Sequence, residues 1–296
     1  MAKNINNKPF DEATKLKLDI FRECFREWLP VFIHNPYIEK IFIYDFFAGS
    51  GSDIEGTFGS PLILLEEAKG ENCKVCNSVK NKQIVFGFNE LKDDKNKELE
   101  TSIKTYIEKC INQNCKEKDC QYKQHIAKME FKDAFKSENF KKILKNDKIA
   151  KFILLDQYGF SQVDENIFKE LVDSPKTDFI FFISSSFIQR FREHENTKKH
   201  IDTSKIDFEN CTPKERHRVI ANYFRGLINK PEYYIHHFSI KKGANHYGLI
   251  FGSSHSFGME KFLKVCWEKD IYSGESSDNI NNDFEQGTLF HNPEES

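Results

Sequence analysis

The residues from Ile41 to Gly51 constrain the fold more than any other part of the chain. Apolar and aromatic residues lead to Asp45, and the sequence Phe-Phe-Ala-Gly-Ser-Gly follows. A continuous apolar run is typical of a parallel strand covered on both faces, and glycine lets the next turn adopt strained backbone angles and approach a ligand. Ligands of open α/β sheets bind beyond the carboxyl ends of the strands. The run therefore predicts a buried strand that enters a nucleotide-type cofactor site.

The rest of the chain alternates apolar segments with helical ones. Further strands are expected at 83–88, 125–131, 150–155 and 178–183. Residues 233–240 and 246–251 flank a Lys-Lys-Gly-Ala-Asn turn, which predicts an antiparallel pair. Strands that alternate with helices imply a mostly parallel sheet with right-handed crossovers, so the pattern alone indicates the α/β class.

Helix signals are clearest in the first seventy residues. Apolar spacing predicts an amphipathic helix over 11–29, which Pro30 should end or bend. Ser60 and Pro61 are expected to begin a second helix, with the serine as its N-cap. We expect one domain over 1–272 and a loosely ordered tail or lid over 273–296. Three insertions are expected, near 71–82, 110–124 and 187–230.

Composition sets broad limits. The 296 residues are 39% hydrophobic and include 29 Phe, enough for a sizeable core. No stretch approaches the roughly 20 apolar residues that a membrane helix needs, so no membrane partner is expected. The first residues carry no apolar targeting region, which favours a cytoplasmic protein. A net charge of −2 provides no global basic field. Local basic clusters remain open to two interpretations, a solvated surface or a phosphate track: Lys141–Lys151, Lys198–His200 and Lys214–Arg218.

The segment Asp45–Gly51 resembles the cofactor motif of S-adenosylmethionine (SAM)-dependent methyltransferases, especially those that act on nucleic acids. A narrower similarity is to the three-Cys-motif partner (TcmP) family. It spans roughly the whole chain but is dense only in four blocks: Asp45–Gly51, Gly59–Leu62, Leu155–Gly159 and Tyr247–Phe251. This resemblance implies a Rossmann-like, mostly parallel seven-stranded sheet with one antiparallel edge strand. It also implies SAM as cofactor, and nucleic acid or a radical-SAM-like three-Cys-motif protein as partner.

The resemblance assigns residues to the cofactor. Asp45 would hold its amino group, and the bend of Phe47, Ala48, Gly49 and Gly51 would pass near its methionine part. An acid that ends the second strand commonly accepts hydrogen bonds from a ribose diol, a role that falls to Glu90. Asp133, expected to end the third strand, would face the adenine amino group. Each residue also has a plainer interpretation, a turn for the glycine bend and a helix cap for the acids. A hollow for an adenosyl group is expected, with Asp45 and the glycine bend at its rim.

Asp156 and Tyr158 are the candidate catalytic residues. They follow the fourth strand, where methyltransferases of base amino groups carry an Asp/Asn-Pro-Pro-Tyr/Phe motif whose aromatic ring stacks on the flipped base. This chain keeps the acid and an aromatic residue but has Gln157 and Gly159 instead of the rest of the motif. The alternative role for Asp156 is a cap for the next helix. The scattered histidines form no defensible nucleophile–base–acid arrangement.

The cysteines suggest either reduced thiols or a metal. Two thiolates separated by two residues can share a tetrahedral metal if a second arm supplies the other ligands. Cys73 and Cys76 have that spacing, and Cys110, Cys115 and Cys120 could form the second arm of a structural zinc site.

Three functions compete. The first is a SAM-dependent methyltransferase. The second is a non-catalytic adaptor that binds a partner on a vestigial methyltransferase fold. The third is a phosphate-processing enzyme in which Asp45, Glu90 and Asp156 hold a metal.

Overall fold

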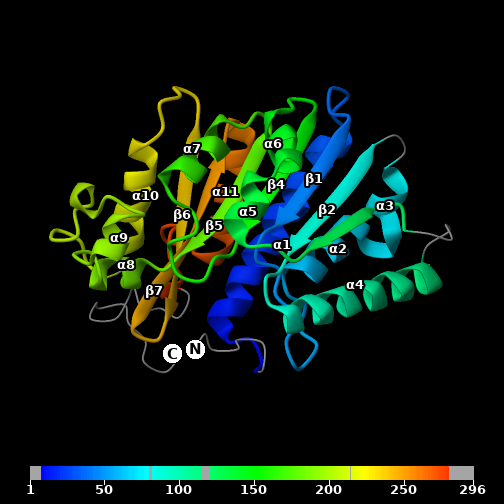
Figure 1. The fold of residues 1–296 in the computed structure, drawn as a ribbon, viewed down its shortest axis with the longest axis horizontal. Helices are drawn as coiled ribbons and strands as arrows, with labels where there is room; N and C mark the ends of the chain where they lie inside the picture. Colours follow the sequence, from blue (N-terminus) through cyan, green and yellow to red (C-terminus); the bar gives the residue numbers. More distant parts are fainter. Residues whose placement is uncertain (1–7, 80–81, 115–119, 214, 280–296) are drawn as a thin grey trace. The chain divides into compact units, whose positions relative to one another are not determined.

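The computed structural model describes residues 8–79, 82–114, 120–213 and 215–279. Seven strands form one sheet in the order β3-β2-β1-β4-β5-β7-β6, as labelled in Figure 1. The chain divides into two compact units, which are described separately. The first comprises 1–156 and 173–179, and the second comprises 157–172 and 180–296. The expectation of a single domain stays a prediction.

Four parallel strands build the first unit. Their bounds are β1 (Lys40–Asp45), β2 (Gln83–Asn89), β3 (Lys123–Ala127) and β4 (Ile149–Leu155). β1 lies between β2 and β4, with Ile43 in register with Phe86 and with Phe152. β3 pairs with the outer side of β2. All four strands run in the same direction, so their carboxyl ends meet at one edge, as the sequence predicts.

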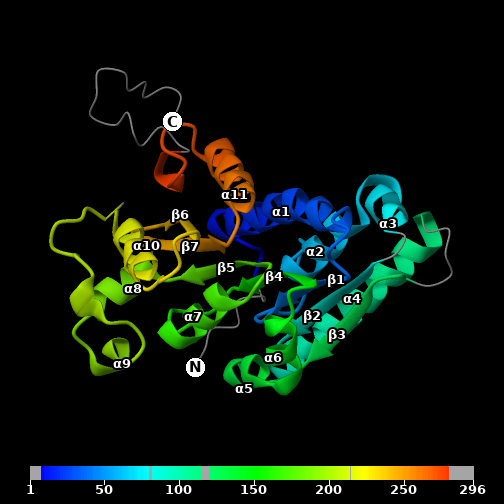
Figure 2. The ribbon, with the colours of Figure 1, turned by 90° about the horizontal axis from the view of Figure 1, so that it is seen from above.

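Aromatic side chains hold the two faces of this sheet. On one face, Phe25 of α1 (Glu12–Ile33) packs on Phe86 and Phe152 with ring centroids 6.5 and 5.4 Å apart. On the other, Phe140 of α6 (Glu138–Lys145) lies 5.4 Å from Tyr44. Figure 2 shows α1 and α6 on opposite sides of β1. Residues 42 and 44 of β1 point away from residue 43, as strand alternation requires, so β1 is covered on both faces.

The remaining elements of the first unit are α2 (Ser60–Lys69), η2 (Glu71–Cys73), α3 (Lys74–Ser78), α4 (Asp93–Asn114) and α5 (Phe131–Lys136). Two local expectations need correction. Pro30 does not end α1, which continues to Ile33, and a bend at Pro30 stays a prediction. Gly59, not Ser60, is the N-cap of α2, because the Ser60 hydroxyl donates to Asp45 instead.

The second unit contains the antiparallel pair β6 (Tyr234–Lys242) and β7 (Asn245–Ser253), at the β6 end of the strand order. α11 (Ser256–Lys269) packs on one face, where Phe262 stacks on Phe251 at 4.5 Å. α10 (Arg216–Gly226) packs on the other, where His217 contacts β7. The remaining elements are α7 (Glu165–Asp173), α8 (Ser185–Arg190), α9 (Glu195–Lys198), η3 (Thr203–Lys205) and η4 (Ser277–Asn279). β5 (Thr177–Ile183) contributes residues to both units.

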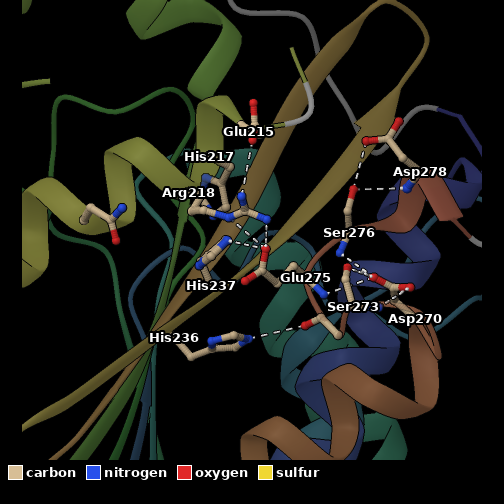
Figure 3. A network of polar contacts seen from close by, with 12 residues as sticks. Glu215, His217, Arg218, His236, His237, Asp270, Ser273, Glu275, Ser276 and Asp278 are labelled. Carbon is tan, nitrogen blue, oxygen red and sulfur yellow. Dashed lines mark hydrogen bonds and ion pairs between the residues drawn. The ribbon is translucent and has the colours of Figure 1, made fainter. Parts of the chain in front are cut away.

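A short C-terminal segment, Gly274–Asp278, covers the outer edge of β6. Ser239 donates its N–H to the Glu275 carbonyl at 2.7 Å and pairs with Ser276 in a parallel bridge. The Asp270 carboxylate fixes the turn that leads into the segment, because it accepts the N–H groups of Glu275 and Ser276, each at 3.1 Å. Figure 3 shows this arrangement. The expectation of a loose tail is therefore wrong for 274–278, and residues 280–296 lie outside the described part of the chain.

These pairings confirm the predicted fold class. The chain has a Rossmann-like α/β architecture whose seven-stranded sheet is mostly parallel and has an antiparallel strand pair at its edge. The predicted third strand is the least accurate, because β3 ends at Ala127 rather than near residue 131. In the described residues, no helix has both the length and the apolar character to cross a bilayer.

Candidate functional site

Asp45 anchors the loop at the end of β1. Its side chain is fully buried. One carboxylate oxygen accepts the Phe47 N–H at 3.0 Å, and the other accepts the Ser60 hydroxyl at 2.6 Å. These bonds fix the start of the glycine bend and join it to the first residue of α2. Asp45 thus positions the loop in this structure, and its direct contact with a cofactor stays a prediction.

Burial has an electrostatic consequence for this carboxyl group. Removal from water raises the pKa of Asp45 to about 7, although the hydrogen bonds from Ser60 and Phe47 act in the opposite direction. The nearby charge of Asp156 raises the pKa further, while that of Lys17 lowers it. Asp45 therefore changes protonation state near neutral pH, and the loop it holds is sensitive to that change.

The glycine bend meets the end of β2 through Glu90. The Gly49 N–H donates to one Glu90 carboxylate oxygen at 3.1 Å, and the Lys92 N–H donates to the other at 2.9 Å. Next to this contact, the Ala48 N–H donates to the Asn89 carbonyl at 3.0 Å. Gly49 adopts φ of 64°, a backbone region that glycine enters without strain. The structure thus brings together the predicted loop and the predicted ribose-binding acid.

Asn89 is a residue of this edge that the sequence did not identify. Its buried side-chain amide donates to the Phe46 carbonyl at 3.3 Å and the Met129 carbonyl at 3.0 Å, and its oxygen accepts the Met129 N–H at 3.0 Å. One amide therefore joins the ends of β1, β2 and β3. A polar residue at the end of an apolar strand could have identified Asn89 as a site residue. The ribose-binding role was instead given to its neighbour Glu90.

Asp133 does not end a strand. It lies exposed in the first turn of α5, and the N-cap of that helix is Glu130, whose carboxylate accepts the Lys132 N–H at 2.6 Å. Both its strand-end position and its alternative role as a helix cap were therefore wrong. The reason is the early end of β3, which leaves a loop of three residues before α5. A contact with adenine stays a prediction.

Asp156 is paired with a cation. Its carboxylate forms an ion pair with Lys17 of α1, and both side chains are largely buried. The ammonium group of Lys17 also lies 6.0 Å from the centre of the Phe21 ring. Sequence reasoning missed Lys17, because a lysine in an amphipathic helix reads as part of the solvated face. The pair places a cation beside Asp156 at the carboxyl end of β4.

Tyr158 is 78% exposed and belongs to the second unit. Its neighbour Gln157 is buried, and the Gln157 side-chain oxygen accepts the N–H groups of Gln162 and Val163 at 2.9 and 3.1 Å. Gln157 thus shapes the loop that presents Tyr158. The joint catalytic role of Asp156 and Tyr158 stays a prediction.

A polar hollow of about 470 Å³ borders the glycine bend on its α4 side. The β1–α2 loop and α4 supply its lining: Ser50, Ser52, Asp53, Ile54, Lys97, Glu98, Thr101 and Ser102. An adenosyl group in this hollow stays a prediction, although Ser50 of the bend reaches it. Asp45 does not line it, because its carboxylate is turned into the protein toward Ser60.

Several predicted thiols gather near α3 and α4. Cys76, Cys110 and Cys120 line a small apolar hollow with Tyr106 and Tyr122. The Gln121 side-chain amide donates to the Cys76 sulfur at 2.7 Å. Cys73 is fully buried and has a positive φ of 57°. Cys115 lies outside the described residues.

No group of three or more His, Cys, Asp or Glu residues is arranged to hold a metal ion in the part of the chain that the structure describes. The described thiols do not form a ready tetrahedral set, so structural zinc stays a prediction. Asp45, Glu90 and Asp156 are likewise not grouped as metal ligands. Their carboxylates contact Ser60, Gly49 and Lys17, respectively. The metal-dependent phosphate-processing alternative therefore lacks its ligand set.

Buried histidines form a polar network in the second unit. His217 has no exposed surface, and its Nε2–H donates to the Leu249 carbonyl at 2.9 Å. Its Nδ1 consequently accepts the Ser185 hydroxyl at 2.7 Å, and burial lowers the pKa of His217 to about 4. Figure 3 shows His217 beside His237, Arg218 and Glu275. The ring is neutral at pH 7 and has a structural role.

No protein-family model and no curated protein matches the chain. Similar solved structures include Trm1 from Pyrococcus horikoshii with S-adenosyl-L-methionine, at 9% identity, a TM-score of 0.45, and coverage of 86% of this chain and 59% of that one. An O-methyltransferase from Bacillus cereus with SAH has 13% identity, a TM-score of 0.39, and coverage of 82% and 91%. The METTL16 MTase domain has 9% identity, a TM-score of 0.36, and coverage of 86% and 76%.

The Bacillus cereus and METTL16 neighbours are methyltransferases. The Trm1 structure contains SAM, and the Bacillus cereus structure contains SAH. The chain spans 59% of the Trm1 chain. All three TM-scores are below 0.5, so these likenesses do not assign a function to the chain. The narrower similarity to the three-Cys-motif partner family is matched by no family model and stays a prediction.

Proposed function

We propose that the first unit binds SAM at the carboxyl edge of β1 and β2. The observation that carries this proposal is the hydrogen bond between the Gly49 N–H and the Glu90 carboxylate, at 3.1 Å. It places the glycine bend beside an acid that can accept hydrogen bonds from a ribose diol. Dinucleotide sites of α/β proteins use the same pair of features.

The available residues suit an adenosyl ligand. Glu90 would exchange its bond to Gly49 for the ribose hydroxyls, and Phe47, Ala48 and Gly49 would contact the ligand through the loop that Asp45 holds. Bound SAM supplies an electrophilic methyl group. The contribution of this chain is to position a nucleophile in line with that group, and Asp156, whose carboxylate pairs with Lys17, is suited to orient an amine.

The acceptor in this proposal is nucleic acid. The aromatic residue that follows Asp156 is the main support, because Tyr158 offers an exposed ring for stacking on a base. A radical-SAM-like three-Cys-motif protein is the proposed protein partner, on the strength of the sequence resemblance alone.

A non-catalytic adaptor is the second candidate. One observation favours it: the three acids of this edge already have partners within the protein, Ser60 for Asp45, Gly49 for Glu90 and Lys17 for Asp156. A vestigial site would keep such internal bonds because no ligand competes for them. A folded protein that binds neither SAM nor S-adenosylhomocysteine would favour this candidate.

Calorimetric titration with SAM and S-adenosylhomocysteine tests the proposal. We expect binding by the wild-type protein and at least about tenfold weaker binding by Glu90→Gln, because the amide loses the charged acceptor. Glu108→Gln is the matched control, since Glu108 is an exposed acid of α4 that does not line the hollow. Unchanged affinity in Glu90→Gln, or no binding by the wild type, would reject the site.

We also propose that the thiols near α3 and α4 bind a structural zinc ion. Support comes from the convergence of Cys76, Cys110 and Cys120 on one hollow from separate segments, and from the Cys-x-x-Cys spacing that ends at Cys76. Zinc content measured by mass spectrometry should fall in Cys76→Ser and be unchanged in Cys211→Ser, a cysteine of the second unit. A wild-type protein purified without zinc that keeps its thermal stability would contradict this proposal.

A further inference from the structure

An aromatic surface on the second unit has no role in cofactor binding. Phe187 and Phe191 are 43% and 38% exposed, although their rings are in contact at a centroid distance of 4.4 Å. Phe160, which is buried, lies against Phe187 at 5.6 Å. These three residues, here called the α8 aromatic surface, join the loop after Asp156 to α8.

The inner face of α8 is firmly held. Ser185 bonds to the fully buried His217 at 2.7 Å, and the Ser186 hydroxyl accepts the His246 N–H at 2.7 Å. Ile188 has no exposed surface. The helix is therefore fixed from the inside while its outer side carries two partly exposed rings. Exposed rings on a fixed support bind a ligand without the entropic cost of ordering a loop.

The charges around the surface favour a small number of phosphate contacts. Arg190 lies between the two rings in the sequence, is exposed, and donates to the neutral Asn245 side chain at 3.2 Å. Acids already neutralise two neighbouring cations, since Arg192 pairs with Glu209 and Lys198 with Glu193. Ring stacking must therefore supply more of the affinity than charge does.

The size of the surface argues for a base rather than a protein. A stable protein interface buries roughly 800 Å² on each partner, and two rings with about two-fifths of their surface exposed present far less. One or two unpaired bases match that area. Stacking on aromatic rings is the usual way in which single strands are bound without sequence preference.

We propose that the α8 aromatic surface binds unpaired bases of single-stranded nucleic acid by stacking on Phe187 and Phe191. This inference deepens the proposed function and rests on it for the identity of the acceptor. Duplex ends and interiors would bind this surface poorly, because their bases are already stacked and paired.

Fluorescence anisotropy with a labelled 12-nucleotide single-stranded RNA, the DNA of the same sequence and the matching duplex tests this proposal. We expect the single strands to bind and the duplex to bind at least about tenfold more weakly. Phe187→Ala combined with Phe191→Ala should weaken single-strand binding by about tenfold or more. Phe257→Ala is the matched control, because Phe257 is 39% exposed on α11 of the same unit.

A second pair of variants separates stacking from apolar contact. Phe187→Leu and Phe191→Leu keep apolar bulk but lose the aromatic face, so we expect them to lose most of the affinity that the alanine variants lose. Leucine variants that bind like the wild type, or equal binding of duplex and single strand, would overturn the proposal. The affinity of the same variants for SAM should equal that of the wild type. Failure of the base-stacking proposal can therefore be distinguished from failure of the cofactor-site proposal. Circular dichroism would show that each variant is folded.

Discussion

The two units bury polar groups in different ways. In the first, the acids that end β1 and β2 accept backbone N–H groups of the glycine bend, Asp45 from Phe47 and Glu90 from Gly49. In the second, charged side chains pair with one another across distant segments, as when Glu275 meets Arg218 of α10 at 2.9 Å (Figure 3). Bonds from strand-end acids to backbone shape a loop, whereas ion pairs between side chains fasten a terminal segment. The first arrangement suits a ligand site and the second suits a fixed support.

Two glycines give the largest expected effects, one in each unit. A methyl group at Gly248 would clash with the His217 ring, and one at Gly87 would lie 2.5 Å from the Tyr44 ring. We expect Gly248→Ala to lower the free energy of unfolding by about 3–5 kcal/mol, because the overpacked histidine also loses its two hydrogen bonds. Gly87→Ala should cost about 2–3 kcal/mol, since only packing is disturbed.

Urea unfolding measures both effects. Gly226→Ala is the control, because the added methyl group would meet none of the described residues within 4 Å. If Gly248→Ala were no more destabilising than this control, the close packing of His217 against β7 would be wrong.

The pH dependence of stability should have opposite signs in the two units. The pKa of buried Asp45 is about 7 when folded, above its ordinary 3.8. The folded state therefore keeps a proton that the unfolded chain releases, and stability falls as pH rises through this window. The pKa of His217 is about 4 when folded, below its ordinary 6.5. Here the unfolded chain binds the extra proton, so stability rises as pH increases from 4 to 6.5.

Urea unfolding from pH 4 to 8 would separate the two contributions. Relative to the wild type, Asp45→Asn should gain about 2–3 kcal/mol as pH rises from 4 to 7. His217→Gln should lose a similar amount, relative to the wild type, as pH rises from 4 to 6.5. Parallel stability curves for the wild type and either variant would show that the group concerned does not titrate as its burial requires.

Asp270 offers a test of the terminal segment. Its carboxylate accepts N–H groups from Tyr272, Glu275 and Ser276 at 3.1 Å each. We expect Asp270→Ala to cost about 2 kcal/mol, because buried donors lose their acceptor, and to make 270–279 accessible to proteolysis. Asp207→Ala, which changes an exposed turn residue, is the control. Equal resistance to proteolysis in both variants would contradict the role of Asp270.

The smallest effect should come from the ion pair of α1. Lys17→Met leaves the largely buried Asp156 without its cation and should cost about 1–2 kcal/mol. Lys15→Met removes an exposed pair with Glu12 on the same helix and should cost less than about 0.5 kcal/mol. Thermal unfolding of the two variants compares them directly, and equal losses would show that burial of the Lys17 pair has no energetic consequence.

The sequence predicted most of the first unit because its signals are local. An apolar run that ends in Asp45 identifies β1, and acids or amides at later strand ends must meet it at the same edge of a parallel sheet. Asp133 was misplaced because the aromatic and apolar residues around it suit either a strand or a helix. Pro30 does not end α1, because a helix packed along a sheet can continue through a proline when packing outweighs one lost hydrogen bond.

Long-range pairs could not be predicted in the same way. Lys17 lies in a helix whose polar face looks solvated, and only the docking of α1 brings it to Asp156. Glu275 and Asp278 lie in a polar tail whose composition resembles that of disordered segments. Their burial depends on β6 presenting an open edge and on cations and histidines supplied by α10, β6 and β7. Such partners are separated by tens of residues, and no spacing rule connects them.

Hydrogen exchange measured by mass spectrometry, with and without saturating S-adenosylhomocysteine, tests the cofactor site most directly. The account predicts slower exchange at the amides of 46–51 and 89–92, where the glycine bend meets Glu90, with little change over Gly274–Asp278. Unchanged exchange at the bend, or protection confined to the second unit, would contradict it.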